Sequence, residues 1–260
     1  MTTPGPIRIT WIGHATVLIE IGGVKILTDP ALTMSVAHLR RRHPVPTIDE
    51  LSVDVVAVSH IHMDHLHRPS LRRIGGSAPR IIVPAGSASL VRDLGFTEIH
   101  EMKTGDHTQI ELDTRVLRIE AVHADHSGSR GPHSRVSAAA VGFVFRAGNH
   151  SVYFAGDTDK FEQMADIGPV DVALLPVWGW GSTLGERHLN PDTAAQSTLL
   201  LRPTYVIPIH WGTYSPVRSR RGSPAWLDSP LTAFRHALRR INPEVHLIEL
   251  SPGDSIALEP

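Results

Sequence analysis

The chain consists of short apolar runs separated by polar segments rich in glycine and proline. Near the N-terminus, the runs Ile7–Trp11, Thr16–Ile21 and Val24–Thr28 have the composition of β-strands. Gly22-Gly23, between the last two runs, predicts a two-residue hairpin turn. Val53–Ser59 is almost continuously apolar, which is typical of a strand buried on both faces. These patterns predict that the first part of the chain forms a β-sheet.

The rest of the chain repeats this pattern, with helical segments between runs of strands. Further strands are expected at Ile81–Val83, Glu98–Met102, Arg115–Val122, Ala138–Arg146, Ser151–Ala155, Val172–Leu175, Tyr205–Ile209, Val245–Leu250 and Ser255–Leu258. Helices are expected at Gly86–Leu94, Lys160–Ile167, 191–201 and Leu231–Ile241. The third helix should begin after Asn190, a good N-cap, with Pro191 at its first position.

This order of elements indicates an α/β (α+β) fold. Strands that come in runs, with helices interleaved in both halves, predict an αββα sandwich in which two mixed β-sheets pack face to face and the helices lie outside. No low-complexity linker divides the chain, so we expect one domain spanning residues 1–260.

Histidine and cysteine usage narrows the chemistry. The 260 residues include 17 histidines and no cysteine. The lack of cysteine excludes a disulfide scaffold, an iron–sulfur cluster, a thiolate zinc finger and a cysteine nucleophile. Any transition metal must therefore be held by histidine, carboxylate or water.

Charge and hydropathy indicate which partners and which cellular location are expected. Lys+Arg number 25 and Asp+Glu 26, which leaves a net charge of −1 and argues against a dedicated nucleic-acid binder. The N-terminal residues show no signal peptide, and the longest apolar stretch without charge, Val172–Gly185, is interrupted by Pro176. We therefore expect a cytoplasmic protein without a membrane span.

The strongest chemical signal is the segment His60–His65, HIHMDH, which directly follows the predicted buried strand. In an extended segment, residues two apart point the same way, so His60 and His62 can bind one metal ion together. If the chain then turns into a helix, Asp64 and His65 are directed toward a second point nearby. The alternative interpretation is a solvated polar loop that is rich in histidine by chance.

This motif and three later residues make the sequence similar to the metallo-β-lactamase superfamily. His123 follows the strand Arg115–Val122, Asp157 lies in FAGDT and His210 lies in PIHWG, in the order of that family. The resemblance implies an αββα sandwich with a hydrolytic metal site. It further implies that one metal ion is held by His60, His62, His123 and Asp157, and a second by Asp64, His65, His210 and the shared Asp157.

Two histidines of the segment AVHADHS compete for the third ligand position of that family. His123 directly follows the predicted strand and fits the family position, so we predict that His123 is the ligand. His126 is interpreted as a neighbour of the site or a surface residue.

Four short motifs, WIGHAT, LTDP, HLNP and IHWGT, resemble a narrower branch, which contains the N-acyl-phosphatidylethanolamine phospholipase D and the ascorbate-6-phosphate lactonase-like hydrolases. This resemblance implies that Asp29 orients metal-bound histidines, although Asp29 could also cap the turn before Pro30. It implies that His188 faces the substrate, where it would stabilise an oxyanion or protonate a leaving group; the alternative is a residue without a role before a helix. His14 is either close to the site or an ordinary polar residue at a strand start.

The implied reaction is hydrolysis at a dinuclear metal centre. Two ions about 3.5–4 Å apart would share a hydroxide that attacks a phosphodiester, lactone or other ester or amide bond. Asp64 would orient this hydroxide and His188 would assist the leaving group, so these two are the predicted catalytic residues. Zinc is the first choice, and manganese or iron fits the same ligands. The alternatives are a mononuclear iron oxidoreductase and a non-catalytic or nucleic-acid-processing metal-binding module.

Long irregular segments at Ala31–Thr47, Asp125–Arg135 and Thr213–Ser229 are expected to form functional loops. The first and last of these segments each carry a cluster of arginines, namely Arg40, Arg41 and Arg42 in the first and Arg218, Arg220 and Arg221 in the last. Each cluster either binds an anionic small-molecule substrate or is simply solvated. Trp178 and Trp180 either line an apolar pocket or cover the core. The sequence does not indicate an oligomeric state.

Overall fold

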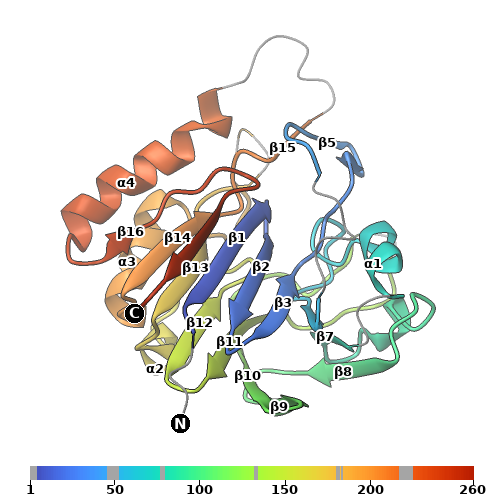
Figure 1. The fold of residues 1–260 in the computed structure, drawn as a ribbon. Helices are drawn as coiled ribbons and strands as arrows, with labels where there is room; N and C mark the ends of the chain where they lie inside the picture. The colour runs from blue at the N-terminus through green and yellow to red at the C-terminus, as the bar shows by residue number, and fades with distance from the viewer. Residues whose placement is uncertain are drawn as a thin grey trace.

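Two seven-stranded β-sheets form the centre of the molecule in the computed structural model, which describes residues 5–45, 53–76, 80–131, 134–179, 182, 184–216 and 225–260 (Figure 1). The first sheet contains, in spatial order, β17 (Ser255–Leu258), β1 (Ile7–Gly13), β2 (Thr16–Ile21), β3 (Val24–Thr28), β6 (Val55–Ala57), β7 (Arg80–Pro84) and β8 (Glu98–Met102). The second contains β16 (His246–Leu247), β14 (Tyr205–Ile209), β13 (Val172–Pro176), β12 (His150–Phe154), β11 (Val141–Ala147), β10 (Arg115–His123) and β9 (His107–Leu112).

Both large sheets are mixed. In the first sheet, β17, β1, β2 and β3 pair antiparallel, whereas β3, β6, β7 and β8 run parallel. In the second sheet, β9 to β12 pair antiparallel, whereas β12, β13, β14 and β16 run parallel. The prediction of two mixed sheets is therefore confirmed.

A third, small sheet consists of β15 (Tyr214–Pro216), β5 (Leu39–Arg41) and β4 (Ser35–Val36), and β5 and β15 lie at the top of Figure 1. It is formed by parts of two segments that the sequence analysis treats as irregular loops. The side chain of Arg41 is buried and donates to the carbonyl oxygens of Ala31, Ile12 and His43. Tyr214 also donates to the Ala31 carbonyl oxygen at 2.9 Å, so the small sheet is joined firmly to the first sheet.

The main core lies between the two large sheets. Its largest side chains are aromatic and fully buried, and they include Trp11 on β1, Phe143 and Phe145 on β11 and Phe154 on β12. Burial of each such side chain stabilises the fold by about 1.5–3 kcal/mol. The alternation of apolar residues in β1 and β2 and the continuous burial of β12 follow from this packing, because one sheet face or both faces are covered.

Helices cover the outer faces of the sheets. The helix α1 (Arg68–Ile74) packs against the first sheet through Leu71 and Ile74. The helices α2 (Met164–Ile167), α3 (Pro191–Leu201) and α4 (Ser229–Ile241) cover the second sheet, and α3 and α4 contact each other. Figure 1 shows α4 and α1 on opposite sides of the molecule. The expected αββα arrangement is present.

Local sequence signals explain two element boundaries, the turn between β2 and β3 and the start of α3. Gly22 and Gly23 both adopt positive φ angles, 58° and 75°, as a two-residue hairpin turn requires, and β2 and β3 flank them. Asn190 accepts hydrogen bonds from the backbone N–H groups of Asp192 and Thr193, and Pro191 takes the first helical position. The helix α3 therefore begins where the sequence predicts it.

Other elements differ from the expectation. The helix predicted at Gly86–Leu94 is only a 3₁₀ turn at Ala88–Leu90, and the strand predicted at Val245–Leu250 is reduced to the two residues of β16. The helix α1 and the edge strand β9 have no counterpart in the sequence analysis. No helix in the described ranges is long and apolar enough to cross a membrane.

Candidate metal centre

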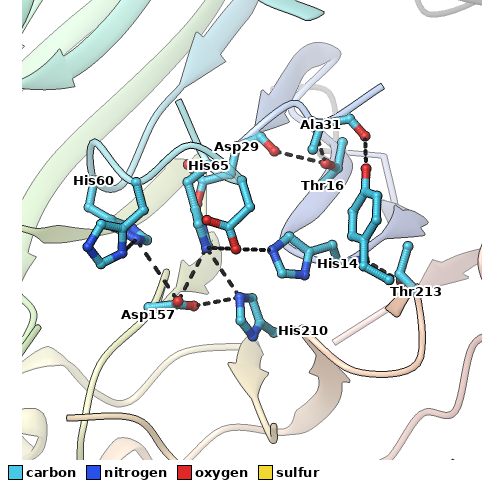
Figure 2. Close-up of polar contacts among 12 residues, drawn as sticks. His14, Thr16, Asp29, Ala31, His60, His65, Asp157, His210 and Thr213 are labelled. Carbon is cyan, nitrogen blue, oxygen red and sulfur yellow. Dashed lines mark hydrogen bonds and ion pairs between the residues drawn. The ribbon is translucent and has the colours of Figure 1, made fainter. Parts of the chain in front are cut away.

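The ends of several strands bring histidines and carboxylates to one edge of the sandwich. The motif His60–His65 follows β6, Asp157 follows β12 and His210 follows β14, while Asp29 follows β3. Figure 2 shows Asp157 between His60, His65 and His210. Five of these residues, Asp29, His60, His65, Asp157 and His210, are at most 3% exposed. A site buried to this degree keeps water away from its charged groups, which strengthens every electrostatic interaction within it.

A first cluster is formed by three imidazoles, those of His60, His62 and His126. The Nε2 atom of His60 lies 3.0 Å from Nδ1 of His62. The Nε2 atom of His126 lies 3.1 Å from the same Nδ1 atom. The ligand atoms of all three residues lie within 4.8 Å of one another, which is compatible with one shared cation.

A second cluster is formed by Asp64, His65 and His210, with His14 beside them. The Nε2 atoms of His65 and His210 are 3.2 Å apart. Asp157 lies between the clusters: its Oδ2 atom is 3.2 Å from His65 Nε2 and 4.0 Å from His60 Nε2. Its Oδ1 atom is 3.1 Å from His210 Nε2. Asp157 is thus positioned to contact a cation in either cluster.

The outer nitrogens of these histidines are held by acceptors. His65 Nδ1 donates to Asp29 Oδ2 at 2.7 Å, and His210 Nδ1 donates to the carbonyl oxygen of Trp178 at 2.7 Å. His126 Nδ1 donates to the carbonyl oxygen of Arg187 at 3.0 Å. Because Nδ1 is the donor, the neutral imidazole presents a lone pair on its inner Nε2 atom, which is the form that binds a metal.

Asp29 makes the orienting contact that the sequence analysis expects of it. Both of its oxygens are used: Oδ1 accepts from the Ser59 backbone N–H at 2.7 Å, and Oδ2 accepts from the Ser59 hydroxyl at 2.6 Å as well as from His65. Because Ser59 Oγ donates to Asp29, its lone pairs remain available to His60 Nδ1, which lies 3.0 Å away. One buried carboxylate thereby fixes two histidines of the motif.

Burial keeps most of these imidazoles neutral. It lowers the pKa of His62 to about 4, with the neighbouring His126 adding to the effect, and it lowers the pKa of His210 to about 3. The pKa of His60 is also lowered well below its usual value, mainly by burial. His65 differs: although burial lowers its pKa, the nearby carboxylates of Asp157, Asp64 and Asp29 raise it well above the usual value. Acidic groups therefore dominate the surroundings of His65.

The donor set fits a metal ion. Asp157 Oδ1 is buried and has no hydrogen-bond partner, although His210 Nε2 is only 3.1 Å away. The Nε2 atom cannot donate, because the proton of neutral His210 is on Nδ1. Two buried lone pairs therefore face each other, which is unfavourable unless a cation lies between them. Imidazole and carboxylate suit zinc, manganese and iron.

The structure corrects the choice between His123 and His126. His123 is still part of β10, paired with Val141, and its exposed ring packs edge-on against Phe161 at a centroid distance of 4.8 Å. The backbone N–H of Asp159 then donates to the Asp125 carbonyl oxygen at 3.0 Å, which joins this loop to the one that carries Asp157. The next residue, His126, is thereby turned into the site and is 7% exposed.

Strand-end placement in the sequence therefore favours His123, whereas the structure brings His126 to the first cluster. The useful signal was the sequence of the loop itself, in which a second histidine stands three residues beyond the strand. The other predicted residues His60, His62, Asp64, His65, Asp157 and His210 are brought together. His14, for which two interpretations were open, lies at the site, with Nε2 3.0 Å from Asp64 Oδ2.

His188 lies beside Asp157, with its Nε2 atom 3.5 Å from Oδ2 and a side chain that is 21% exposed. Its Nδ1 atom donates to the carbonyl oxygen of Glu186 at 2.8 Å. Burial lowers the pKa of His188, but the hydrogen bond to Asp157 outweighs this effect and the pKa is raised. A protonated His188 at this position could donate a proton to a bound molecule.

A cavity of about 820 Å³ adjoins the two clusters and reaches His62, Asp64, Asp157, His188 and His210. Apolar side chains of the small sheet and of two loops form much of its wall, namely Val36, Leu39, Met63, Leu184 and Pro216. All three segments predicted as functional loops thus border the cavity. The segment 125–135 is also attached to the motif through Arg130, whose guanidinium donates to the carbonyl oxygens of Ile61 and Leu66.

The first basic cluster serves mainly to hold the structure together. Arg41 is buried among carbonyl oxygens, as described above, and Arg42 donates to the carbonyl oxygen of Gly212 at 2.9 Å and pairs with Asp228 at 3.0 Å. Neither guanidinium is therefore directed at a substrate. Arg218, Arg220, Arg221 and Trp180 lie outside the described residues, whereas Trp178 holds His210 through its carbonyl oxygen.

Comparisons with known proteins agree with this fold and site. A model of the β-lactamase superfamily domain matches residues 24–211. The chain is 30% identical over 262 residues to a metal-dependent hydrolase of Methanopyrus kandleri, and the match covers 95% of this chain and 98% of that one. The chain therefore belongs to the β-lactamase superfamily, whose members of its own length include metal-dependent hydrolases.

Two further similarities are more distant or partial. The N-acyl-phosphatidylethanolamine-hydrolyzing phospholipase D 1 of Caenorhabditis elegans is 31% identical over 226 residues, which are 79% of this chain but only 64% of that protein. This chain therefore spans less than two thirds of that relative. Igni18, a metallo hydrolase from Ignicoccus hospitalis, superposes with a TM-score of 0.71 at 24% identity, over 97% of this chain and 98% of the other. The second match supports the fold alone.

Proposed function

We propose that the protein is a hydrolase with two metal ions. The first ion would be held by His60, His62, His126 and Asp157, and the second by Asp64, His65, His210 and the shared Asp157. Asp157 supports this assignment most directly, because its buried Oδ1 atom lacks a hydrogen-bond partner and faces the lone pair of His210. The presence of a second complete donor set, beside the histidine cluster, favours two ions over one.

Bound ions would polarise the scissile bond and lower the pKa of a water molecule, which is the chemistry that hydrolysis at neutral pH requires. The residues of the chain have separate tasks around them. Asp29 fixes His65 and, through Ser59, His60. Asp64 accepts at Oδ2 from His14 and borders the cavity, where it can hold the attacking water.

His188 is the proposed proton donor to the leaving group. Its Nε2 atom is next to Asp157, its side chain borders the cavity and its pKa is raised by that carboxylate, a shift toward the protonated form that a proton donor needs. The substrate is a small molecule with a phosphodiester, lactone or other ester or amide bond. Relatives support this range: the similar proteins include a phospholipase D by name and metal-dependent hydrolases.

The experiment combines metal analysis with hydrolysis assays. Purified protein would be reconstituted with Zn²⁺ or Mn²⁺, its metal content measured, and its activity tested on a phosphodiester, a lactone and an anilide. We expect two ions per chain and hydrolysis of at least one substrate. The variant His60→Ala should lower the activity by more than about 100-fold, since even residues that only orient ligands affect activity by about 10–100-fold.

The matched control is His123→Ala, which removes an exposed imidazole outside both clusters and should leave metal content and activity unchanged. Full occupancy by two ions without hydrolysis of any of these substrates would contradict the catalytic proposal. Fewer than two ions per chain after reconstitution would contradict the dinuclear assignment.

A further inference from the structure

His14 reaches the second cluster from the turn between β1 and β2. The turn places two consecutive residues in the left-handed region, Gly13 at φ 129° and His14 at φ 55°. Left-handed backbone is unfavourable for a residue with a side chain, so it persists only where the surroundings hold it. This conformation directs the imidazole of His14 inward, where the side chain is 2% exposed.

Three hydrogen bonds hold this strained turn in place, and two of them come from the segment of His210. The backbone N–H of His14 donates to Thr213 Oγ1 at 2.7 Å, and the His14 carbonyl oxygen accepts from the backbone N–H of His210 at 3.0 Å. The same carbonyl oxygen accepts from Trp11 Nε1 at 2.9 Å. Figure 2 shows His14 and Thr213 beside the cluster. The turn and the segment of His210 therefore form one rigid unit.

The ring of His14 is also fixed. It packs against the ring of His210 at a centroid distance of 4.0 Å and lies edge-on to Tyr214 at 5.4 Å. Its Nε2 atom lies 3.0 Å from the carboxylate oxygen Oδ2 of Asp64. A carboxylate oxygen can only accept, so His14 Nε2 carries the proton and donates it to Asp64 Oδ2.

This bonding differs from that of the histidines assigned as ligands. In His65, His126 and His210, Nδ1 donates to an acceptor behind the ring, so that in the neutral imidazole Nε2 is the atom with a lone pair toward the cluster. In His14, Nε2 faces the cluster and uses its proton on Asp64. A protonated nitrogen cannot bind a metal ion, so the geometry gives His14 a different role from its neighbours.

We propose that His14 is a positioning residue for Asp64. Its hydrogen bond to Oδ2, the oxygen that also lies 3.8 Å from His65 Nε2, holds this carboxylate at the second ion. This inference rests on the proposed dinuclear function. It assigns the strained turn at His14 a purpose: the turn fixes Asp64 and the segment of His210 together, so two ligands of the second ion keep their relative geometry. The first cluster, which does not contact His14, should be independent of it.

The test compares two substitutions at one position. His14→Gln keeps an N–H donor at the reach of Nε2 but removes the imidazole, whereas His14→Leu removes the donor at similar size. Each variant and the wild type would be titrated with Co²⁺, whose absorption spectrum reports ligand changes, and the dissociation constants of the first and second ion would be measured. The control is His123→Leu, which removes an imidazole away from the site.

We expect His14→Leu to weaken binding of the second ion by about 10–100-fold, the range known for residues that orient metal ligands, and to leave the first ion unchanged. His14→Gln should restore binding to within about threefold, because the donor returns. Unchanged second-ion affinity in His14→Leu would overturn the proposal. Equal losses in both variants, with an altered Co²⁺ spectrum, would overturn it by showing that His14 is itself a ligand.

A measurement on the wild type avoids any dependence on the folding of the variants. In a long-range ¹H–¹⁵N spectrum of the protein loaded with Zn²⁺, His14 should appear as the tautomer with its proton on Nε2. An unprotonated Nε2 would contradict the proposal. If the wild type binds fewer than two ions, the proposed function fails; if it binds two and only the predictions for His14 fail, the dinuclear assignment stands.

Discussion

The two clusters of the candidate metal centre differ in charge although they share Asp157. In the first cluster, His60, His62 and His126 are neutral imidazoles whose pKa values are lowered chiefly by burial. In the second cluster, carboxylates surround His65 and raise its pKa. Neutral ligands bind a cation without competition from protons at neutral pH, whereas the second cluster holds charged groups that partly compensate one another.

This difference indicates that the two ions would be held by different means. The first cluster offers three preformed nitrogen donors, and the outer nitrogens of two of them, in His60 and His126, are fixed by Ser59 and the Arg187 carbonyl oxygen. The second depends on the orientation of carboxylates, with Asp29 behind His65 and His14 behind Asp64. Substitutions that act on the shared residue should therefore affect both ions, and substitutions within one cluster should affect mainly one.

The largest effect is expected for Asp157→Asn, because Asp157 contacts both clusters. The amide keeps the size of the side chain but removes the charge that both cations would share. We expect loss of both ions at micromolar metal and a loss of activity of more than about 100-fold. Metal analysis after gel filtration measures the first effect. Retention of one tightly bound ion in this variant would show that Asp157 is not shared.

The next effect is expected for His126→Ala, which removes one donor from the first cluster only. Affinity for the first ion should fall by more than about 10-fold, while the second cluster keeps its complete donor set. The comparison variant is His123→Ala, which should bind both ions as the wild type does. Metal titration of both variants measures their affinities for the first and the second ion. The opposite ranking of the two variants would restore His123 as the ligand.

The charge difference between the clusters should appear in the pH dependence of stability in the metal-free protein. The pKa of His62 is lowered from 6.5 to about 4, so the unfolded chain binds its proton more readily and stability is lost as pH falls from 6.5 toward 4. The pKa of His65 is raised, so its contribution is complete below 6.5 and is lost as pH rises above that value.

Urea unfolding with a chelator present, measured across this pH range, should therefore show maximal stability near neutral pH. The variant His62→Gln should flatten the acid side of the curve and leave the alkaline side unchanged. His65→Gln should do the reverse. An acid side that is the same in His62→Gln and the wild type would contradict the lowered pKa of His62.

The smallest effect concerns Tyr153, which provides a comparison for Asp157. Among the described residues, the Tyr153 hydroxyl and Asp157 Oδ1 are the two buried side-chain atoms without a hydrogen-bond partner. Tyr153 lies in the apolar cluster under α3, away from the metal centre. Tyr153→Phe removes the unpaired hydroxyl and should raise the free energy of unfolding by about 1 kcal/mol, without change in metal binding. Destabilisation in urea would show that the hydroxyl is satisfied.

Most of the sandwich was predictable because its elements carry local signals. The strands β2, β3, β8, β14 and β17 have the predicted bounds, and α3 has both its predicted cap and its predicted end. The motif His60–His65 was found because two-residue spacing after a buried strand already implies a shared direction. These signals come from residues that are close together in the sequence, so they can be recognised in the amino-acid sequence alone.

Elements that depend on distant contacts were missed. The seven residues of α1 are too few to show helical periodicity, and β9 is a polar edge strand in which Ile110 is the one buried residue. The small third sheet forms because Arg41 and Tyr214, far apart in the sequence, bind the same carbonyl oxygen of Ala31. The turn that brings His126 to the site likewise depends on Asp159. The single domain, the cytoplasmic location and the choice of zinc remain predictions.

The most direct test of the dinuclear centre is anomalous diffraction from crystals of the protein reconstituted with Zn²⁺, recorded at the zinc absorption edge. The account predicts two peaks, one among His60, His62 and His126 and one among Asp64, His65 and His210, with Asp157 between them. A single peak, or a peak at His123, would contradict it.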